Sequence, residues 1–490
     1  MQVDPMRTMT RMHVMTSIMP NSVSIPTRMS FRTALALCFA TAALLWGSFF
    51  PLNAGFLAWF AFVPMLLLVR APIAPWKAAA ATLIGGYAFN IVTMEWIRIA
   101  DPRMYASWIA LSFYCSLFFP VSLWLVRRLD RMQLPLTLTF PLVWVPLEYF
   151  KSHFLTGFAW YLLGHSQHDY LPMIQITDLT GVYGISFLIA ASNGLITELC
   201  LFAFRARLAL PATLRPSRLV LQATIVAALL AATVGYGYFR LRQGNFAEGP
   251  KVALLQSNLD QRMKNARMLG NQEGLDAISF MHKTMHDLTA EARSKHSGVD
   301  LMVWPETMCP HEWRCIEPAV DSCPTAWQEM IQDRCDMVRE IALFSRANVL
   351  LGINTMELTN SERDNRYNSA LLIRKDGKPI GRYDKIHCVP FGEYVPMRKT
   401  MPFMSVFVPY DYDYSLTEGN KRTRFVLPTP RGDFTFGAII CYEDSDPLLA
   451  RKYVQDEVAG EPPVDFLVNM SNDGWFNGHP EHEQHLAICR

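Results

Sequence analysis

Long apolar runs without charged residues fill the chain up to about residue 240 and are absent after it. A helix needs about 20 apolar residues to cross a bilayer, and runs of that kind predict seven spans. The expected spans cover 33–50, 52–69, 78–97, 106–126, 135–150, 182–204 and 219–239. The fifth contains Pro135, Pro141 and Pro146, which predicts a kinked or partly re-entrant helix. We therefore expect a disordered polar tail over 1–30 and a transmembrane bundle of about seven helices over 31–240.

The second half of the chain, 241–490, has short β-rich runs that alternate with longer polar stretches of helical character. The runs VALLQSN, DLMVWPE, VLLGINT and DFLVNMSND predict strands, whereas 272–296 and 325–347 predict helices. Asp376 and Gly377 lie between two alternating apolar runs, which is a strong signal for a β-hairpin. Alternating strands and helices with an added hairpin predict an α/β sandwich that contains a mixed sheet.

The connection 148–193 mixes aromatic, glycine and polar positions and matches neither pattern. One interpretation is an amphipathic segment at the membrane surface, with Trp160, Tyr161 and Tyr170 at the level of the headgroups. The other is a lipid-side entrance to an active site. Both interpretations place this segment at the boundary between lipid and water.

Composition agrees with a membrane protein and excludes one class of partner. Of the 490 residues, 51% are hydrophobic and only 18% are charged, which is unusually apolar for a soluble chain of this length. The net charge is +2, and no polybasic tract or basic stripe with aromatic residues occurs. We therefore expect no nucleic-acid partner.

Lysine and arginine gather before the first expected span and after the second, fourth and sixth. They are Arg7, Arg11, Arg28, Arg32, Arg70, Lys77, Arg127, Arg128, Arg131, Arg205, Arg207, Arg215 and Arg218. The alternate loops hold only Arg98, Arg103 and Lys151, and Arg240 and Arg242 are a local exception after the last span. Because cytoplasmic loops retain positive charge, the N-terminus is expected in the cytoplasm and the globular half outside it.

Four of the ten cysteines, Cys309, Cys315, Cys323 and Cys335, cluster in a polar stretch of the half expected outside the cytoplasm. Disulfides persist in such compartments, so two bridges among these four are expected, in any of three connectivities. A zinc site is the alternative. It is disfavoured because the stretch contains no C-x-x-C pair.

Candidate chemistry lies where three apolar strands end. The run FTFGAIICYE delivers Cys441 into an acidic turn, VWPET ends in Glu306, and Lys385 follows the expected hairpin. Taken singly, Cys441 is explained equally well as a core cysteine, Glu306 as a helix cap and Lys385 as a solvated lysine. Together they supply a thiol, a base and a cation at one edge of an α/β sheet, where active sites form.

These three residue types define a nucleophilic mechanism. Lys385 and the backbone N–H groups that begin near Tyr442 are expected to favour the Cys441 thiolate. Glu306 would take the thiol proton and return it to a leaving group. Lys385 and the Tyr442 N–H would stabilise the negative charge of a tetrahedral intermediate.

In this order the three residues resemble the Glu-Lys-Cys triad of the nitrilase, or carbon–nitrogen hydrolase, superfamily, and Glu393 in PFGEYVP resembles its additional glutamate. The membrane half, with LTGFAWYLLGHSQ, IQITDLTGVYGISF and NMSNDGWF, resembles the membrane-embedded branch of that superfamily, the apolipoprotein N-acyltransferase family. The resemblance runs from about residue 31 to the end of the chain. It implies an α-β-β-α sandwich after the bundle. The family continues past the position of Arg490, so the sandwich is expected to be incomplete at its C-terminus.

The resemblance also implies a reaction. A phospholipid acyl chain would pass to Cys441 as a thioester and then, in a ping-pong sequence, to the α-amine of a diacylglyceryl-cysteine lipoprotein. It implies further that Tyr442, Glu443, Asn472 and Trp475 shape the pocket. No cofactor is expected, and the location implied is the bacterial inner membrane, with the catalytic half in the periplasm.

Three alternatives stay open at this point. A membrane-tethered amidase of the same superfamily would use water in place of the amine, and a non-catalytic membrane scaffold would use neither. In HPEHEQH, His479, His482 and His485 are potential metal ligands, but the spacing differs from HExxH and no further ligand is evident. A solvated helix without a metal is the expectation for that segment.

Overall fold

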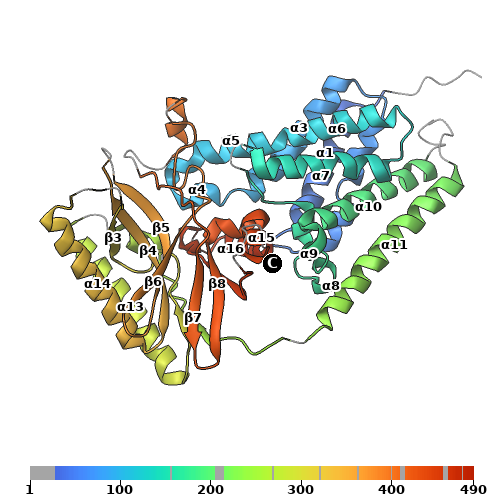
Figure 1. Ribbon diagram of the computed structural model, residues 1–490. Coiled ribbons are helices and arrows are strands. Elements are labelled where there is room, and N and C mark those ends of the chain that lie inside the picture. The colour runs from blue at the N-terminus through green and yellow to red at the C-terminus, as the bar shows by residue number, and fades with distance from the viewer. Residues whose placement is uncertain are drawn as a thin grey trace, which may run out of the picture.

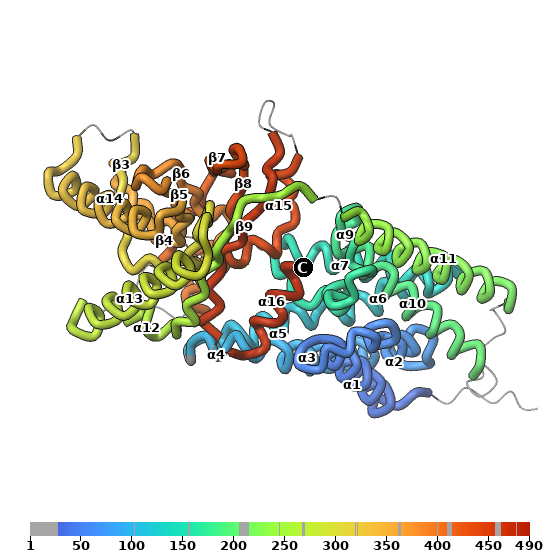
Figure 2. The backbone as a smooth tube through the Cα atoms, turned by 90° about the horizontal axis from the view of Figure 1, so that it is seen from below, coloured from blue at the N-terminus to red at the C-terminus, as the bar shows by residue number. Residues whose placement is uncertain are grey.

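The computed structural model describes residues 28–490 apart from 155–156, 205–214, 245, 267–269, 319, 321, 361–363, 399, 409–413, 456–461 and 477. The tail expected over 1–30 therefore lies almost wholly outside the described residues. A helical bundle and a two-sheet sandwich lie side by side, with the last helices of the chain between them (Figures 1 and 2).

The bundle contains the helices of the first half of the chain. They are α1 (Phe31–Ser48), α2 (Val63–Leu66), α3 (Pro75–Thr93), α4 (Ile97–Ala100), α5 (Tyr105–Ser116), α6 (Phe118–Asp130), α7 (Leu136–His153), α8 (Leu171–Ile174), α9 (Thr177–Thr180), α10 (Val182–Ala203) and α11 (Pro216–Leu241), with the 3-10 turns η1 (Gly55–Trp59), η2 (Leu67–Val69), η3 (Pro102–Met104) and η5 (Leu163–Gln167). Within the described residues, four helical segments are long and apolar enough to cross a membrane: α1, α5 with α6, α10 and α11.

One expectation for the bundle is wrong. The second expected span is not one long helix, because the segment Gly55–Val69 consists of the short turns η1, α2 and η2. The fifth expected span is the helix α7, which contains Pro141 and Pro146. Close packing supports α7, since a Cβ on Gly194 of α10 would come within 2.3 Å of the Leu136 carbonyl oxygen.

The outer faces of the bundle are apolar, as lipid contact requires. Large apolar side chains that are exposed there include Phe39, Trp76, Ile84, Ile109, Phe113, Val121, Trp124, Val220, Leu221 and Ile225. Only 22% of the apolar window of α11 is buried, so most of this helix faces outward. Side chains of this kind are stable on a surface when the surrounding medium is hydrocarbon.

Basic residues gather at one end of the bundle. Arg70, just after η2, forms ion pairs with Asp130 at the end of α6 (2.7 Å) and with Glu198 in α10 (3.5 Å). Arg127 of α6 donates a hydrogen bond to the Leu68 carbonyl (3.2 Å). The ends of η2 and α6 therefore meet the last turns of α10.

The second half of the chain forms two sheets. Their strands are β1 (Val252–Leu254), β2 (Leu301–Val303), β3 (Glu312–Ile316), β4 (Asn348–Leu358), β5 (Asn365–Ile373), β6 (Pro379–Asp384), β7 (Arg424–Thr429), β8 (Gly432–Ile440) and β9 (Phe466–Met470). The larger sheet has the order β1-β2-β4-β5-β6, and β3 pairs in parallel with the C-terminal part of β4. The smaller sheet has the order β7-β8-β9. Strands β1, β2 and β4 are parallel, whereas β4, β5 and β6 are antiparallel, so the expected mixed sheet is confirmed.

The sheets pack face to face between helices. Leu350 and Leu372 of the larger sheet meet Phe425 and Phe436 of the smaller one in one buried cluster. Helices α13 (Gln272–Lys295) and α14 (Thr325–Ser345) cover the outer face of the larger sheet. Helix α15 (Pro447–Val454) covers the smaller sheet, and α16 (Glu481–Cys489) lies beside it, next to the bundle (Figure 2). The expected α-β-β-α sandwich is therefore confirmed.

The hairpin between β5 and β6 lies where Asp376 and Gly377 predict it. Ile373 pairs with Pro379, and Gly377 has φ +86°, a conformation that glycine adopts without strain.

The two expected disulfides do not form, because Cys315, Cys323 and Cys335 are free thiols. Cys315 lies on β3, where its sulfur accepts a hydrogen bond from Arg382 (2.7 Å), and Cys335 lies on α14 against the core of the larger sheet. The predicted helix over 325–347 already contained Cys335, whereas the strand that carries Cys315 was not predicted from the sequence.

Candidate active site

The three strand ends singled out from the sequence meet at one cavity. Glu306 follows β2, Lys385 follows β6 and Cys441 follows β8, and all three line a cavity of about 460 Å³. Asn472 and Trp475, also expected at the pocket, line the same cavity. Folding therefore brings these residues together as the sequence predicts.

Cys441 lies at a sharp turn. It begins the 3-10 helix η8 (Cys441–Ser445) directly after β8, and its φ of +53° is in the left-handed region that side chains rarely adopt. Glu443 holds this turn: its Oε2 accepts from the Ile440 N–H (2.7 Å), while Oε1 accepts from the N–H groups of Ile386 (2.7 Å) and His387 (2.9 Å). This buried carboxylate therefore joins the cysteine turn to the loop after Lys385 and lies behind the cavity instead of lining it.

Lys385 is buried among carboxylates. Its Nζ lies 2.9 Å from Glu393 Oε1 and 3.7 Å from Glu306 Oε1, and its side chain is only 1% exposed. Burial alone would lower the pKa of Lys385, but the negative charges of Glu393 and Glu306 outweigh it and raise that pKa well above its usual value. Lys385 is therefore a permanent cation at this site.

Glu306 is fixed by two neighbours. Its Oε1 accepts from Asn368 Nδ2 (2.7 Å) and its Oε2 accepts from the Asn472 N–H (2.9 Å). Asn368 also donates to Glu393 Oε1 (3.2 Å), so one amide orients both glutamates. Sequence reasoning missed Asn368. The one signal was an asparagine inside the otherwise apolar strand NSALLI.

Opposing effects act on the protonation of Cys441. Burial raises the pKa of the Cys441 thiol well above its usual value, and the charge of Glu306 raises it further, whereas Lys385 opposes them without prevailing. Lys385 thus favours the thiolate, as expected, but burial and the charge of Glu306 outweigh it. Attack by this sulfur requires that a base remove its proton during the reaction.

The bundle forms the opposite wall of the cavity. Most of its lining residues there are apolar, and Asp101 and Ser107 are polar exceptions. The apolar ones include Trp96, Ile97, Ala100, Met104, Ala110, Leu111, Tyr114, Phe154, Phe158 and Trp160. Tyr442, the residue after Cys441, stacks on Trp160 and donates a hydrogen bond to the Gly157 carbonyl (3.0 Å). The cavity is thus polar where the sandwich ends and apolar where the bundle begins.

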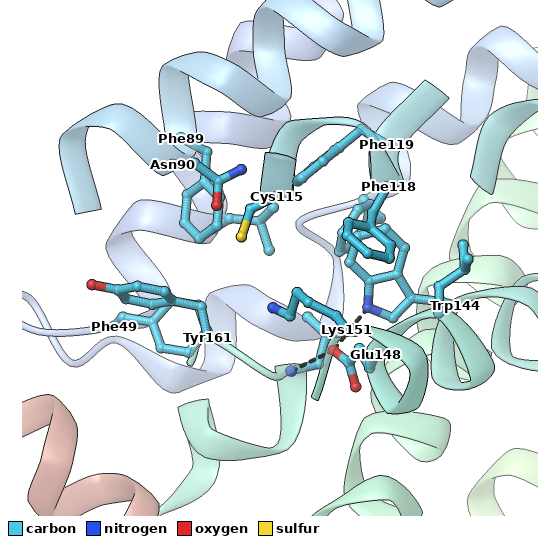
Figure 3. Close-up of a pocket in the computed structure, with 14 residues that line it drawn as sticks. Phe49, Phe89, Asn90, Cys115, Phe118, Phe119, Trp144, Glu148, Lys151 and Tyr161 are labelled. Atoms are coloured by element: carbon cyan, nitrogen blue, oxygen red, sulfur yellow. Dashed lines mark hydrogen bonds between the residues drawn. The ribbon is translucent and has the colours of Figure 1, made fainter. Parts of the chain in front are cut away.

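Two buried charges inside the bundle fix the segment that carries Trp160. Lys151 Nζ donates to the Trp160 carbonyl (2.8 Å). Glu148 Oε1 accepts from the Leu163 N–H (2.8 Å) and from Trp144 Nε1 (2.9 Å) (Figure 3). This irregular backbone is buried in protein, which is the condition for its stability near a membrane.

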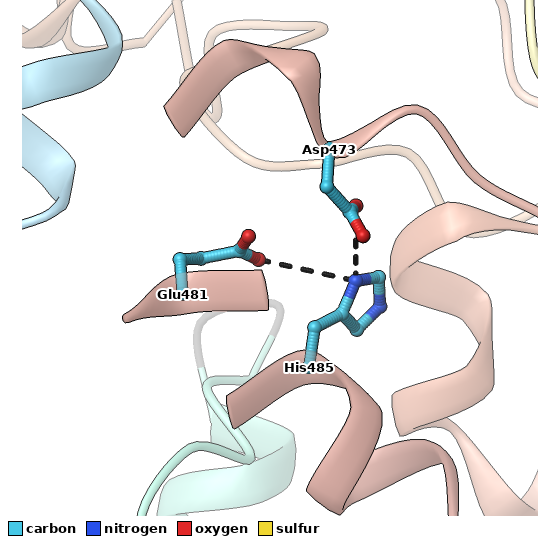
Figure 4. Close-up of side chains that lie close together, drawn as sticks. All are labelled: Asp473, Glu481 and His485. Carbon is cyan, nitrogen blue, oxygen red and sulfur yellow. Dashed lines mark hydrogen bonds and ion pairs between the residues drawn. The ribbon is translucent and has the colours of Figure 1, made fainter. Parts of the chain in front are cut away.

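The histidine-rich segment departs from the expected solvated helix. His485 on α16 is buried, with Nε2 2.9 Å from Asp444 Oδ1 and Nδ1 3.2 Å from Asp473 Oδ1 (Figure 4). Glu481 lies 3.9 Å from the same Nδ1, and the ligand-type atoms of Asp473, Glu481 and His485 lie within 4.8 Å of one another. Periodicity could not reveal this cluster, because Asp444 and Asp473 come from other loops.

Comparison with known proteins identifies both halves of the chain. The family model described as apolipoprotein N-acyltransferase N-terminal domain matches residues 41–195, and the one described as carbon–nitrogen hydrolase matches residues 270–490. An apolipoprotein N-acyltransferase from Geobacter metallireducens is 34% identical over 440 residues, which are 88% of this chain and 76% of that protein. One from Rhodopirellula baltica is 26% identical over 92% of this chain and 83% of that protein.

Among solved structures, an amidase from Nesterenkonia sp. is 15% identical, with 49% of this chain and 74% of that chain covered and a TM-score of 0.28. The relatives share both the helical half and the carbon–nitrogen hydrolase half. The chain belongs to the apolipoprotein N-acyltransferase family.

Proposed function

We propose that this protein transfers a fatty acyl chain from a phospholipid to the α-amine of a diacylglyceryl-cysteine lipoprotein, through a thioester on Cys441. One observation carries the proposal: Cys441, Lys385 and Glu306 share a cavity whose other wall is built from apolar residues of the bundle. Such a wall accommodates acyl chains, while the polar end holds the reacting carbonyl group.

In the first half-reaction, Cys441 Sγ attacks the ester carbonyl carbon while Glu306 takes the thiol proton. The Lys385 ammonium and the Tyr442 N–H stabilise the negative oxygen of the tetrahedral intermediate. The carbon–oxygen bond to the glycerol then breaks, and Glu306 returns its proton to the leaving alkoxide. The products are a lysophospholipid and an acyl thioester on Cys441.

In the second half-reaction, the unprotonated α-amine of the acceptor attacks the thioester carbonyl carbon. Glu306 takes a proton from the attacking nitrogen and gives it to the departing Cys441 sulfur, which leaves as a thiol. The products are an amide and the starting enzyme. Because Glu306 begins and ends each half-reaction as a carboxylate, its fixed position between Asn368 and Asn472 serves both.

The site also requires a defined place in the cell. We propose the bacterial inner membrane, with residues 31–240 as the transmembrane bundle and 241–490 as the periplasmic catalytic domain. The basic end at Arg70 and Arg127 supports this orientation, because positive charge stays on the cytoplasmic face. Helices α4 and α5, whose residues line the cavity, begin at the other end of the bundle.

The test separates the two half-reactions. The full chain, in phospholipid vesicles, should gain the mass of one acyl chain, and hydroxylamine should remove that mass, as it does from thioesters. Adding a synthetic diacylated lipopeptide should then yield N-acylated peptide. Cys441→Ser should abolish the adduct, whereas the control Cys323→Ser should retain it. Release of free fatty acid without N-acylated peptide would overturn the proposal in favour of an amidase, and absence of any adduct would favour a scaffold.

A further inference from the structure

A second group of charges lines the same cavity and has no part in the reaction described above. Asp473, Glu481 and His485 all line the cavity that holds Cys441. Figure 4 shows the carboxyl groups of Asp473 and Glu481 directed at the same nitrogen of the His485 ring, Nδ1. The other nitrogen of the His485 ring, Nε2, lies 2.9 Å from Asp444 Oδ1.

Asp473 brings this cluster close to the nucleophile. It lines the cavity together with Cys441, its negative charge raises the pKa of the Cys441 thiol, and its Oδ1 accepts a hydrogen bond from the Ser471 hydroxyl (2.7 Å). The same Asp473 oxygen meets His485 Nδ1 at 3.2 Å. The cluster therefore lies next to the reacting sulfur.

The cluster has an excess of negative charge. Burial alone would lower the pKa of His485, but its hydrogen bonds to Asp444 and Asp473 raise it well above its usual value, so His485 is a cation. Burial alone would raise the pKa of Asp473, but the bond to His485 lowers it, so Asp473 is ionised. One imidazolium thus faces three acidic residues, Asp444, Asp473 and Glu481.

Within this cluster, Glu481 has an oxygen whose hydrogen bonding is unsatisfied. Its side chain is 3% exposed, and its Oε2 has no hydrogen-bond partner in the described part of the chain. Leaving such an oxygen unpaired is costly, which indicates a ligand that donates to it. A divalent metal is disfavoured as that ligand, because both nitrogens of the His485 imidazolium donate to carboxylates and neither offers a lone pair.

We propose that Glu481, supported by Asp473 and His485, binds the α-ammonium group of the lipoprotein acceptor and removes its proton before the amine attacks the Cys441 thioester. The inference rests on the proposed function. The carboxylate of Glu481 takes one proton from the ammonium, the free amine attacks, and the carboxylic acid of Glu481 later releases that proton to solvent. The residue thus favours an amine over water as the acceptor.

The titration of Glu481 agrees with this role. Burial raises the pKa of Glu481 from 4.5 to about 8. The charges of Asp473 and Asp444 also raise this pKa, whereas the charge of His485 lowers it. The Tyr161 hydroxyl also faces Glu481, from the bundle side. A base whose pKa lies near the working pH exchanges protons with an amine at little cost.

Transfer from preformed acyl-enzyme to a saturating diacylated lipopeptide, measured between pH 6 and 9, tests the proposal. In the wild type, the positive charge of the bound ammonium lowers the pKa of Glu481 below its value in the free protein, so the pair holds one proton and the rate should change little with pH. In Glu481→Gln only the unprotonated amine reacts, so the rate should fall about tenfold per pH unit below about 8, to roughly 100-fold below wild type at pH 6. The exposed neighbour Glu483 gives the control, because Glu483→Gln should keep the wild-type profile.

Two further measurements separate this inference from the proposed function. Acyl-enzyme should form on Glu481→Gln as fast as on the wild type, and hydroxylamine, which is unprotonated at neutral pH, should cleave both thioesters equally. A wild-type pH profile in Glu481→Gln, failure of that variant to form acyl-enzyme, or loss of wild-type transfer on adding EDTA would overturn the inference. Failure of the wild type itself to form acyl-enzyme would overturn the proposed function instead.

Discussion

Tyr442 lies parallel to Trp160, with ring centroids 5.5 Å apart and an interplanar angle of 7°. Tyr442 follows Cys441 in the sandwich, whereas Trp160 belongs to the bundle segment held by Lys151. This stacked pair therefore joins the turn that carries the thiol to the membrane-side wall of the cavity. The position of Cys441 depends in part on a contact between the two halves of the chain.

The first prediction concerns this contact. Tyr442→Phe keeps the stacked ring and loses only the hydrogen bond to the Gly157 carbonyl. It should lower the free energy of unfolding by about 1 kcal/mol and the rate of acyl transfer only a few-fold.

Trp160→Ala removes the stacking partner and should lower the free energy of unfolding by about 3–5 kcal/mol. Thermal unfolding and acyl transfer in a double-mutant cycle should show coupling of about 0.5–1.5 kcal/mol between Tyr442→Ala and Trp160→Ala. Substitution of the exposed Trp124 is the control. Strictly additive effects of Tyr442→Ala and Trp160→Ala would contradict a coupling between the two residues.

The second prediction concerns the base. Glu306→Gln keeps an oxygen for Asn368 or Asn472 but cannot accept a proton, so acyl-enzyme formation should slow by roughly 100- to 10,000-fold. The Glu306 charge raises the pKa of Cys441, so its removal should lower that pKa. The rate of thiol alkylation as a function of pH would then have its midpoint at a lower pH in Glu306→Gln than in the wild type. An unchanged midpoint would show that the carboxylate does not act on the thiol. Glu340→Gln, at an exposed position of α14, is the control.

The third prediction concerns Lys385. Lys385→Met leaves the carboxylates of Glu306 and Glu393 without their buried cation, and the free energy of unfolding should fall by about 3–5 kcal/mol. Thermal unfolding measures this loss, and Lys378→Met on the exposed hairpin should show almost none. Combining Lys385→Met with Glu393→Gln should recover part of the stability, because one unpaired charge is removed. A double variant that is less stable still would mean that the cation has another structural role.

Much of this site was predictable because its main residues follow apolar strand runs. Glu306, Lys385 and Cys441 each end such a run, and the sheet order then brings those ends to one edge. Asn368 was not predictable in this way, since its role depends on which two glutamates the antiparallel strand places beside it.

The cluster around His485 was hidden for a similar reason. Asp473 and Asp444 lie 12 and 41 positions away in the sequence, and only the packing of α16 against two loops brings them to His485. The sequence predicts the cation beside Cys441 but not the burial that outweighs its effect on the thiol pKa. Residue order thus predicted that Glu306, Lys385 and Cys441 meet, whereas their solvation depended on the two halves packing together.

The last prediction uses the buried acid as a probe of stability. Glu481 has a pKa of about 8 in the folded protein and an ordinary pKa near 4.5 when unfolded. Between these values the folded state holds a proton that the unfolded state has released, so stability falls as pH rises, by up to about 1.4 kcal/mol per unit. His485 adds a decline of the same sign only above its ordinary pKa of 6.5. Burial also raises the pKa values of Glu443 and Asp384, which add declines of the same sign, so the contribution of Glu481 is the difference in slope between the wild type and Glu481→Gln.

Thermal unfolding between pH 5 and 6 should therefore show a midpoint temperature that falls with rising pH in the wild type and falls less steeply in Glu481→Gln. The exposed Glu483→Gln should behave like the wild type. Equal slopes in the wild type and Glu481→Gln would mean that Glu481 is ionised at low pH in the folded protein. In that case the acid would be paired with a cation already, and the cavity would lack the open carboxylate that an ammonium group needs.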